Sequence, residues 1–166
     1  MTVKTDRRRV LGGMALAGAA GIAAPALLTK TRAYAQERTI KVGHVSPRTG
    51  PLAGFAEADE YILEGIRAKF AEGIEGAGGR YAIEIITADS QSNPNRAAEV
   101  ASDLILGEEV DIITAASTPD TTNPVADQAE LNEVPCITTD CPWQPYFFGR
   151  SGDPAVGFES TYHFFW

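Results

Sequence analysis

The chain has 166 residues, a net charge of -8 and an ordinary apolar content of 44%. That length allows about one domain with a core of its own. The charge is unevenly divided, because residues 1–35 carry a net charge of +5 and the remainder therefore carries -13. The charged residues of the first part are Lys4, Asp6, Arg7, Arg8, Arg9, Lys30 and Arg32. An acidic surface repels phosphate backbones, so nucleic acid is not an expected partner.

The first 35 residues have the composition of an export signal. Arginines at 7–9 precede an apolar run at 10–28, and the small-residue cleavage pattern Ala33-Tyr34-Ala35 follows. The start of this segment, RRRVL, resembles the twin-arginine export motif. A transmembrane anchor is the alternative, but a run of 19 residues with four glycines and a proline is marginal for a span of about 20 strongly apolar residues. We therefore expect a twin-arginine-type signal peptide, cleaved after Ala35, and a periplasmic mature protein.

From residue 39 onward, strand patterns alternate with helical ones. β-Branched residues predict a first strand at Thr39–Val45, followed by a Pro- and Gly-containing loop at Ser46–Gly54. A helix is expected at Phe55–Gly73, and Tyr81–Ala88 then alternates as a second strand. The helix should bury a stripe that recurs every four residues, formed by Ile62, Ile66, Phe70 and Ile74.

An Asn-Pro pair marks the expected start of each of two further helices. Asn93 is a strong N-cap residue and Pro94 suits the first helical position, so a helix is predicted from there to Gly107. The same pair recurs at Asn123-Pro124, which predicts a helix from there to about Asn132.

Short apolar runs complete the pattern. A strand at Val110–Ile113 leads into a polar loop at 116–122, and Cys136–Thr139 is a fourth strand. We interpret Tyr146–Phe148 as a short edge strand and Thr161–Trp166 as the start of a helix. This alternation predicts an α/β fold with a parallel, doubly wound sheet.

The loop after the third strand is crowded with polar side chains: Ser117, Thr118, Asp120, Thr121 and Thr122. Open α/β sheets bind ligands at the carboxyl ends of their strands. Turn and helix-cap chemistry is an equally good interpretation of any single one of these residues. Binding rather than catalysis is expected, because the sequence has no Gly-rich phosphate loop, nucleophile elbow or His-based triad.

Several motifs share their order with a known family: DSQSNP at 89–94 before a helix, VDII at 110–113, Val134-Pro135 before a short strand, and Ser46-Pro47 with Thr49-Gly50. In these motifs the chain resembles the solute-binding proteins of ABC importers, in particular the branched-chain amino-acid (leucine-binding) type. The resemblance covers residues 39 to about 150. It implies a flavodoxin-like sheet that forms the first lobe of a type I periplasmic binding protein, with the second lobe absent from residues 36–166.

The resemblance also implies a function. A complete protein of this type is an extracytoplasmic receptor that delivers a small polar molecule, such as an amino acid or an amide, to an ABC permease in the inner membrane. It is expected to be a monomer without a cofactor. Because a two-lobed receptor buries its ligand between two walls, one lobe alone is expected to bind weakly.

Eight residues are candidates for the ligand site: Phe55, Ser117, Thr118, Asp120, Thr121, Thr139, Asp140 and Trp143. For Trp143, packing against Pro142 and Pro145 is an equally good interpretation. In the family a serine after the third strand meets the ligand carboxylate, and here its place falls on Pro119 or Asp120. Pro119 has no N–H to donate and Asp120 repels an anion, so the flanking Thr118 and Thr121 are expected to take over. Asp140 is of the right type to pair with an ammonium group.

The remaining reactive residues favour structural roles. An extended chain puts Cys136 and Cys141 too far apart to bridge without a tight turn, so we expect two free, mostly buried thiols. His44 and His163 lack metal-ligand spacing, and core or capping roles are expected for them rather than a metal site.

Two other functions stay open. One is an exported enzyme on a flavodoxin-like sheet, which the missing cofactor fingerprint disfavours. The other is a ligand sensor for a membrane receptor, which no residue distinguishes from a transport receptor.

The export hypothesis gives a first prediction. Replacement of Arg7 and Arg8 by Lys should reduce the amount of protein in the periplasmic fraction, because the twin-arginine route reads the arginine pair. Comparison of the fractions from the variant and the unaltered protein measures this. Undiminished export of the variant would remove the twin-arginine assignment and leave the signal peptide intact.

Overall fold

The structure, a computed structural model, describes residues 38–164. The expected signal peptide and the last two residues of the expected final helix lie outside this range. Six strands form the sheet: β1 (Thr39–Ser46), β2 (Ile74–Gly76), β3 (Gly79–Asp89), β4 (Ile112–Ala116), β5 (Cys136–Thr139) and β6 (Thr161–Phe164). The helices are η1 (Ala53–Ala56), α3 (Asp59–Lys69), α4 (Pro94–Ser102) with a π-helical turn η2 (Asp103–Gly107), α5 (Pro119–Leu131) and α6 (Trp143–Gly149). None of the helices within residues 38–164 has both the length and the apolar character needed to cross a bilayer.

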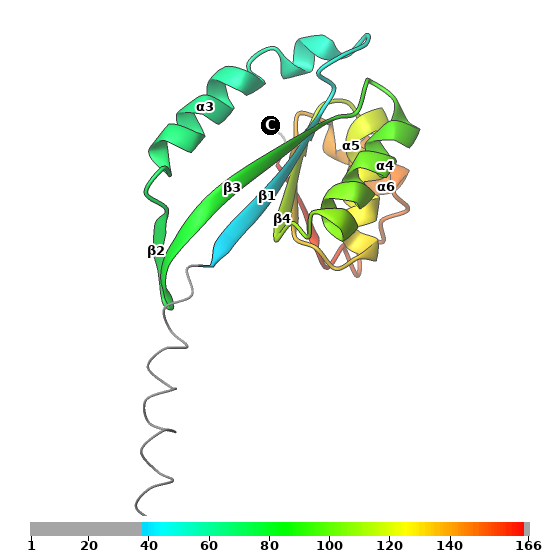
Figure 1. Cartoon of the computed structure of the whole chain (residues 1–166). Coiled ribbons are helices and arrows are strands. Elements are labelled where there is room, and N and C mark those ends of the chain that lie inside the picture. Colours follow the sequence, from blue (N-terminus) through cyan, green and yellow to red (C-terminus); the bar gives the residue numbers. More distant parts are fainter. Residues whose placement is uncertain (1–37, 165–166) are drawn as a thin grey trace, which may run out of the picture. The chain divides into compact units, whose positions relative to one another are not determined.

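The strand order is β2-β3-β1-β4-β5-β6. β1 pairs in parallel with both β3 and β4, β4 pairs in parallel with β5, and β5 with β6. Without the short β2, this is the flavodoxin-like order, in which the chain changes direction across the sheet after its second long strand. Figure 1 shows α3 on one side of the sheet and α4, α5 and α6 on the other. The expected parallel, doubly wound α/β fold is therefore confirmed.

The core lies between the sheet and the helices α4 and α5. Val45 of β1 and Ile113 of β4 are at most 2% exposed and face these helices. The helices meet them with small side chains, which allow close packing and are themselves fully buried: Ala97, Ala101, Ala126 and Ala129. Burial of each large aliphatic side chain contributes about 1.5–3 kcal/mol, so this face dominates the stability of the fold.

One of the two Asn-Pro pairs starts a helix and the other does not. The Asn93 side chain accepts hydrogen bonds from the backbone N–H groups of Asn95 and Arg96 at 2.9 and 3.0 Å, which confirms it as the N-cap of α4. The expected start of α5 at Asn123 is wrong, because the helix begins four residues earlier, at Pro119. Pro119 occupies the first helical position, where no N–H is needed, and Pro124 lies inside the helix.

Three further expectations about secondary structure are wrong. Residues 146–148 belong to helix α6, which Pro142 starts from its N-cap position, and do not form an edge strand. Thr161–Phe164 is the strand β6, for which its β-branched and aromatic residues are suited. The expected helix at 55–73 is divided into η1 and α3 and ends at Lys69, and the chain then forms β2 instead of continuing as a helix.

The loop after β1 is fixed to the end of β3 by one carboxylate. Asp89 accepts hydrogen bonds from the Thr49 hydroxyl at 2.7 Å, from the Thr49 N–H at 3.2 Å and from the Gln91 N–H at 2.8 Å. Burial raises the pKa of Asp89, but these hydrogen bonds lower it, and the net pKa lies below its ordinary value. The first residue of the DSQSNP motif therefore holds the loop that leads to Phe55.

Ser92 of the same motif fixes the middle of this loop. Its hydroxyl donates to the Thr49 carbonyl at 2.7 Å and accepts from the Leu52 N–H at 3.0 Å. Gly50 has a φ of 89°, and a Cβ at this position would lie 2.7 Å from the Ser92 Oγ. The glycine is therefore required both for its backbone conformation and for the close approach of Ser92.

These contacts predict that Asp89→Asn lowers the free energy of unfolding by about 1 kcal/mol at pH 7, since the site is partly open to solvent. A carboxyl group with a lowered folded-state pKa stabilises the fold above its unfolded pKa of about 4, and this contribution is lost as the pH falls through the lower, folded-state value. The difference between the variant and the unaltered protein should therefore shrink at low pH.

Urea unfolding of both proteins at pH 7 and below pH 4 measures this difference. Asp103→Asn is the matched control, because Asp103 is exposed and makes no side-chain hydrogen bond to the described residues. It should change the free energy of unfolding by less than about 0.5 kcal/mol. A constant difference across the pH range would contradict the role given to the Asp89 carboxylate.

Candidate functional site

The loops after β1, β4 and β5 meet at one edge of the sheet. The three strands run parallel, and the register pairs Ala116 at the end of β4 with Thr139 at the end of β5. β1 lies between β3 and β4, so the loops after β1 and β4 leave the sheet at its change of direction. That position is where open α/β sheets bind small molecules.

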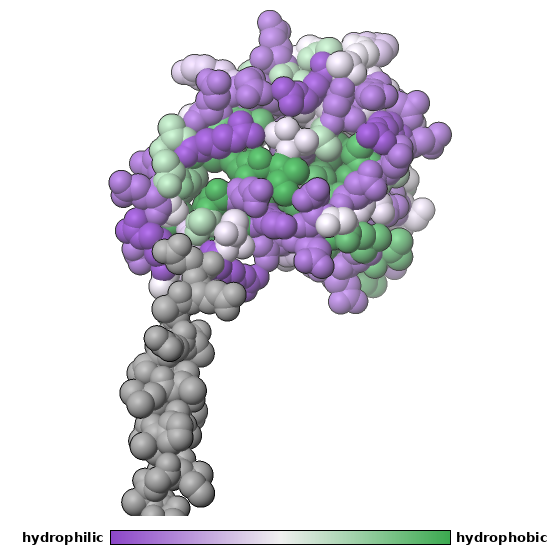
Figure 2. Space-filling view, viewed as in Figure 1, coloured by the Kyte–Doolittle hydropathy of each residue, from purple (hydrophilic) through white to green (hydrophobic). Residues whose placement is uncertain are grey.

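A groove of about 670 Å³ lies between α3 and the sheet and reaches this edge. Three of the candidate residues line it: Phe55 from η1, and Thr139 and Asp140 from the end of β5. Most of the other lining residues are apolar, among them Val42, Ile62, Ile66, Phe70, Ile83, Ile85 and Ile137. Figure 2 shows these apolar side chains in a hollow of the surface.

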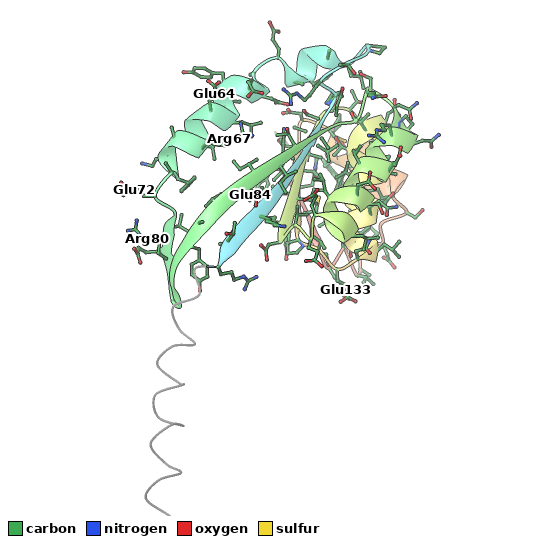
Figure 3. All side chains as sticks on the ribbon, viewed as in Figure 1. Glu64, Arg67, Glu72, Arg80, Glu84 and Glu133 are labelled. Atoms are coloured by element: carbon green, nitrogen blue, oxygen red, sulfur yellow. The ribbon has the colours of Figure 1, made fainter. Side chains whose placement is uncertain are left out.

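The groove changes the interpretation of the apolar stripe on α3. Ile62 and Phe70 point toward the sheet as expected, yet they are 51% and 37% exposed, and Leu63 is the only buried residue of the helix. The expectation of a buried stripe is wrong, because nothing within residues 38–164 fills the space between α3 and the sheet. Arg67 approaches the sheet from α3, with its guanidinium 3.4 Å from the Ile85 carbonyl (Figure 3).

A histidine fixes the start of α3 to the sheet beneath this groove. His44 Nδ1 lies 2.9 Å from the Thr114 hydroxyl of β4, and Nε2 lies 3.3 Å from the Asp59 carboxylate at the first position of α3. The histidine and carboxylate are each about 15% exposed. No sequence pattern connects His44, Thr114 and Asp59, because only the folded sheet brings β1, β4 and α3 together.

The polar residues after β4 belong to the first turn of α5 rather than to an open loop. Thr118 is the N-cap, and its carbonyl accepts from the N–H groups of Thr121 and Thr122 at 3.2 and 3.0 Å. Asp120 is exposed in this turn, where a carboxylate is favourable at the positive end of the helix. The hydroxyls of Ser117, Thr118, Thr121 and Thr122 are buried and have no hydrogen-bond partner within the described part of the chain.

Unpaired buried hydroxyls cost stability, so they are expected to meet water or a ligand. Ser117 and Thr118 stand next to Ala116, which lines the groove. In the register, Ala116 is paired with Thr139, the last residue of β5. None of the four candidates after β4 lines the groove itself: Ser117, Thr118, Asp120 and Thr121.

Trp143 lies apart from the other candidates. It is the first residue of α6, 48% exposed, and packs against Phe147 and Phe148 at ring-centre distances of 6.3 and 5.8 Å. It lines a separate hollow of about 240 Å³ with Tyr146, Phe147, Phe158, Thr161 and His163.

A buried arginine organises the sheet edge behind this aromatic cluster. The Arg150 side chain is 1% exposed and donates to the Asp127 carboxylate at 2.6 Å, to the Tyr146 hydroxyl at 2.7 Å and to the Thr161 hydroxyl at 2.9 Å. Its guanidinium also lies 4.0 Å from the centre of the Phe158 ring. The sequence offered no signal for this network, because Thr161 belongs to a segment that was predicted to be a helix and is the strand β6.

The cysteines are free and buried, as expected. Burial raises the pKa of the Cys136 thiol to about 12 and that of Cys141 to about 11. Both are therefore protonated at neutral pH and unreactive as nucleophiles. Within residues 38–164 no three His, Cys, Asp or Glu side chains are arranged to hold a metal ion.

Comparisons with known proteins agree with this architecture. Residues 39–166 match the sequence profile of the periplasmic binding protein family. No curated protein matches the chain at the level of sequence. Among solved structures, the chain is similar to the branched-chain amino acid transporter substrate-binding protein LivJ of Streptococcus pneumoniae in complex with isoleucine, with 22% identity and a TM-score of 0.59 over 76% of this chain and 33% of that one.

Two further structures show the same likeness. The solute-binding protein of an ABC transporter from Rhodopseudomonas palustris, in complex with 3,4-dihydroxybenzoic acid, has 21% identity and a TM-score of 0.60 over 76% of this chain and 32% of that one. The leucine-binding protein LivK of Thermotoga maritima has 22% identity and a TM-score of 0.56 over 75% of this chain and 32% of that one. The chain thus spans about a third of the length of these structures, and at these identities the likeness shows the fold.

The family profile covers most of the chain, and the mostly parallel sheet with its helices matches the fold of the similar structures. The family is one of binding proteins, which fits the expectation of binding rather than catalysis. The chain belongs to the periplasmic binding protein family, its fold is that of a lobe of a type I periplasmic binding protein, and its resemblance to the branched-chain amino-acid type is confirmed.

Proposed function

We propose that this chain is the first lobe of an extracytoplasmic receptor that delivers a small polar molecule, an amino acid or an amide, to an ABC importer in the inner membrane. Residues 1–35 serve as a cleaved signal peptide of the twin-arginine type in this proposal. The mature lobe, residues 36–166, supplies one wall of a ligand cleft and a second lobe supplies the other. The complete receptor acts as a monomer.

The observation that carries the proposal is the apolar groove between α3 and the sheet, with the polar residues Thr139 and Asp140 at its end. Thr139 at the end of β5 and Asp140 directly after it line the groove, and Thr139 is in register with Ala116 at the end of β4. Phe55 faces the same groove from η1 and offers a flat apolar surface, 46% exposed. A site that combines apolar area with a few converging polar groups is typical of small-molecule pockets.

Asp140 supports a ligand that carries a positive or neutral nitrogen group. Its side chain is exposed at the groove, and no Lys, Arg or His of the described chain lies within ion-pair distance of it. An ammonium or amide N–H satisfies such a carboxylate, whereas a second carboxylate repels it. A zwitterionic amino acid is therefore favoured over a simple dicarboxylate.

The carboxylate end of such a ligand has a natural partner in the start of α5. The first turn of a helix attracts anions, and the Thr118 and Thr121 hydroxyls there are buried and without a partner in the described part of the chain. Asp120 in the same turn opposes a carboxylate, which favours an approach from the side of Ser117 and Thr118. Trp143 does not join this set, because it lines the separate hollow at α6.

One wall buries only part of a ligand. If a complete receptor binds with a micromolar constant, about -8 kcal/mol, half of the contacts give about -4 kcal/mol, a dissociation constant on the order of millimolar. Binding by this chain is therefore best followed by NMR titration, which detects such affinities.

Asp140→Asn should weaken the binding of L-isoleucine by about tenfold, because the substitution replaces a charged hydrogen bond with a neutral one. The measurement is an NMR titration of the isotopically labelled protein with L-isoleucine, succinate and 3,4-dihydroxybenzoate. L-Isoleucine should shift the amide signals of residues near 139–141, and succinate should not.

Asp120→Asn is the matched control. Asp120 is also exposed at the carboxyl edge of the sheet, but it does not line the groove, so this variant should bind L-isoleucine at least as well as the unaltered chain. Stronger binding of succinate than of L-isoleucine would refute the proposed ligand class.

A further inference from the structure

One histidine of β6 holds the loop that follows β5. His163 Nε2 lies 2.7 Å from the carbonyl oxygen of Cys141, and Nδ1 lies 2.8 Å from the Thr138 hydroxyl. A carbonyl can only accept, so Nε2 carries the hydrogen in this contact. A single imidazole thus connects the end of β5 with the loop beyond it.

The loop needs such a contact, because its backbone is unusual. Asp140 has a φ of 68°, in the left-handed region that residues other than glycine adopt rarely. A residue keeps this conformation only where its surroundings hold it. The Cys141 carbonyl follows Asp140 directly, and its hydrogen bond to His163 therefore restrains the backbone on the far side of Asp140.

The imidazole is itself held in place. Its ring stacks on Tyr146 of α6, with ring centres 4.1 Å apart and planes 14° from parallel. The Tyr146 hydroxyl accepts from the buried Arg150, which is bonded in turn to Asp127 of α5. The orientation of His163 is therefore set by α5 and α6, and it does not depend on the loop that it restrains.

The protonation of His163 suits this contact. Burial lowers its pKa, the hydrogen bond to the Cys141 carbonyl raises it, and the nearby Arg150 charge lowers it, so that the net pKa lies below its ordinary value. The ring is accordingly neutral at pH 7, with its one hydrogen on Nε2 and with Nδ1 free to accept from Thr138.

We infer that His163 is a positioning residue for the ligand site, whose Nε2–H fixes the loop 139–142 so that Asp140 faces the groove. This inference rests on the proposed function, which makes Asp140 a ligand residue. It assigns to His163 a role in binding, although the residue does not line the groove.

Two substitutions of His163 separate the hydrogen bond from the packing. His163→Phe keeps a flat ring to stack on Tyr146 and removes the donor to Cys141. His163→Gln keeps an N–H at the place of Nε2 and removes the ring. Tyr162→Phe is the matched control on the same strand, because Tyr162 is 57% exposed and contacts this network only through its backbone carbonyl, which accepts from the Thr138 hydroxyl and is kept in the variant.

Backbone ¹⁵N relaxation of the chain gives the first readout. In His163→Phe the order parameters of Asp140, Cys141 and Trp143 should fall from about 0.85 to below about 0.6, while those of β1 and β4 stay unchanged. His163→Gln should restore rigid values, and Tyr162→Phe should not differ from the unaltered protein. A rigid loop in His163→Phe would overturn the inference.

Imidazole ¹⁵N shifts of the unaltered protein provide a test that needs no variant. They should show the neutral ring with hydrogen on Nε2, whereas hydrogen on Nδ1 alone would rule out the contact with Cys141.

L-Isoleucine titration then separates the two proposals. A roughly tenfold weaker affinity in His163→Phe, rescued by His163→Gln, supports the positioning role in binding. A rigid unaltered loop that does not respond to L-isoleucine would contradict the ligand class and leave the restraint by His163 intact.

Discussion

The position of β1 between β3 and β4 is the constraint on which the rest of the structure depends. Because β1 pairs in parallel with both neighbours, the chain must leave its carboxyl end in one direction and that of β4 in the other. The two departing segments cannot fill the space between them, and polar groups from several loops collect there. Both the Asp89 contacts and the groove at Phe55 follow from this arrangement.

The two faces of the sheet differ in how completely they are covered. The face under α4 and α5 is packed with fully buried alanines and the side chains of Val45 and Ile113. The face under α3 leaves Ile62 and Phe70 exposed along the groove. Parallel sheets are normally covered on both faces, whereas the second face here leaves an apolar groove that the described residues do not fill.

The structure also explains why the DSQSNP motif has its particular residues. Asp89 and Ser92 fix the loop after β1, and Asn93 caps α4. None of the three lines the groove. The motif that carries the strongest family resemblance therefore acts on the groove indirectly, by giving the loop before Phe55 a fixed backbone.

The sequence alone predicted the class of fold, the strands β1, β3 and β4, the helix α4 and the family, because these depend on local periodicity, on Asn93-Pro94 and on short motifs. It misjudged the extent of the helix that precedes β2. It also identified Thr139 and Asp140 at a strand end. It placed the start of α5, the helix α6 and the strand β6 wrongly, since Pro119 and Pro124 offer equal local signals and aromatic residues suit a strand and a helix alike. Three features became visible only in the folded chain. His163 contacts Cys141, Arg150 joins α5 to β6, and Trp143 lies apart from Phe55. Each of these depends on which strands become neighbours, and that is set by the packing of the whole sheet rather than by any local stretch of sequence.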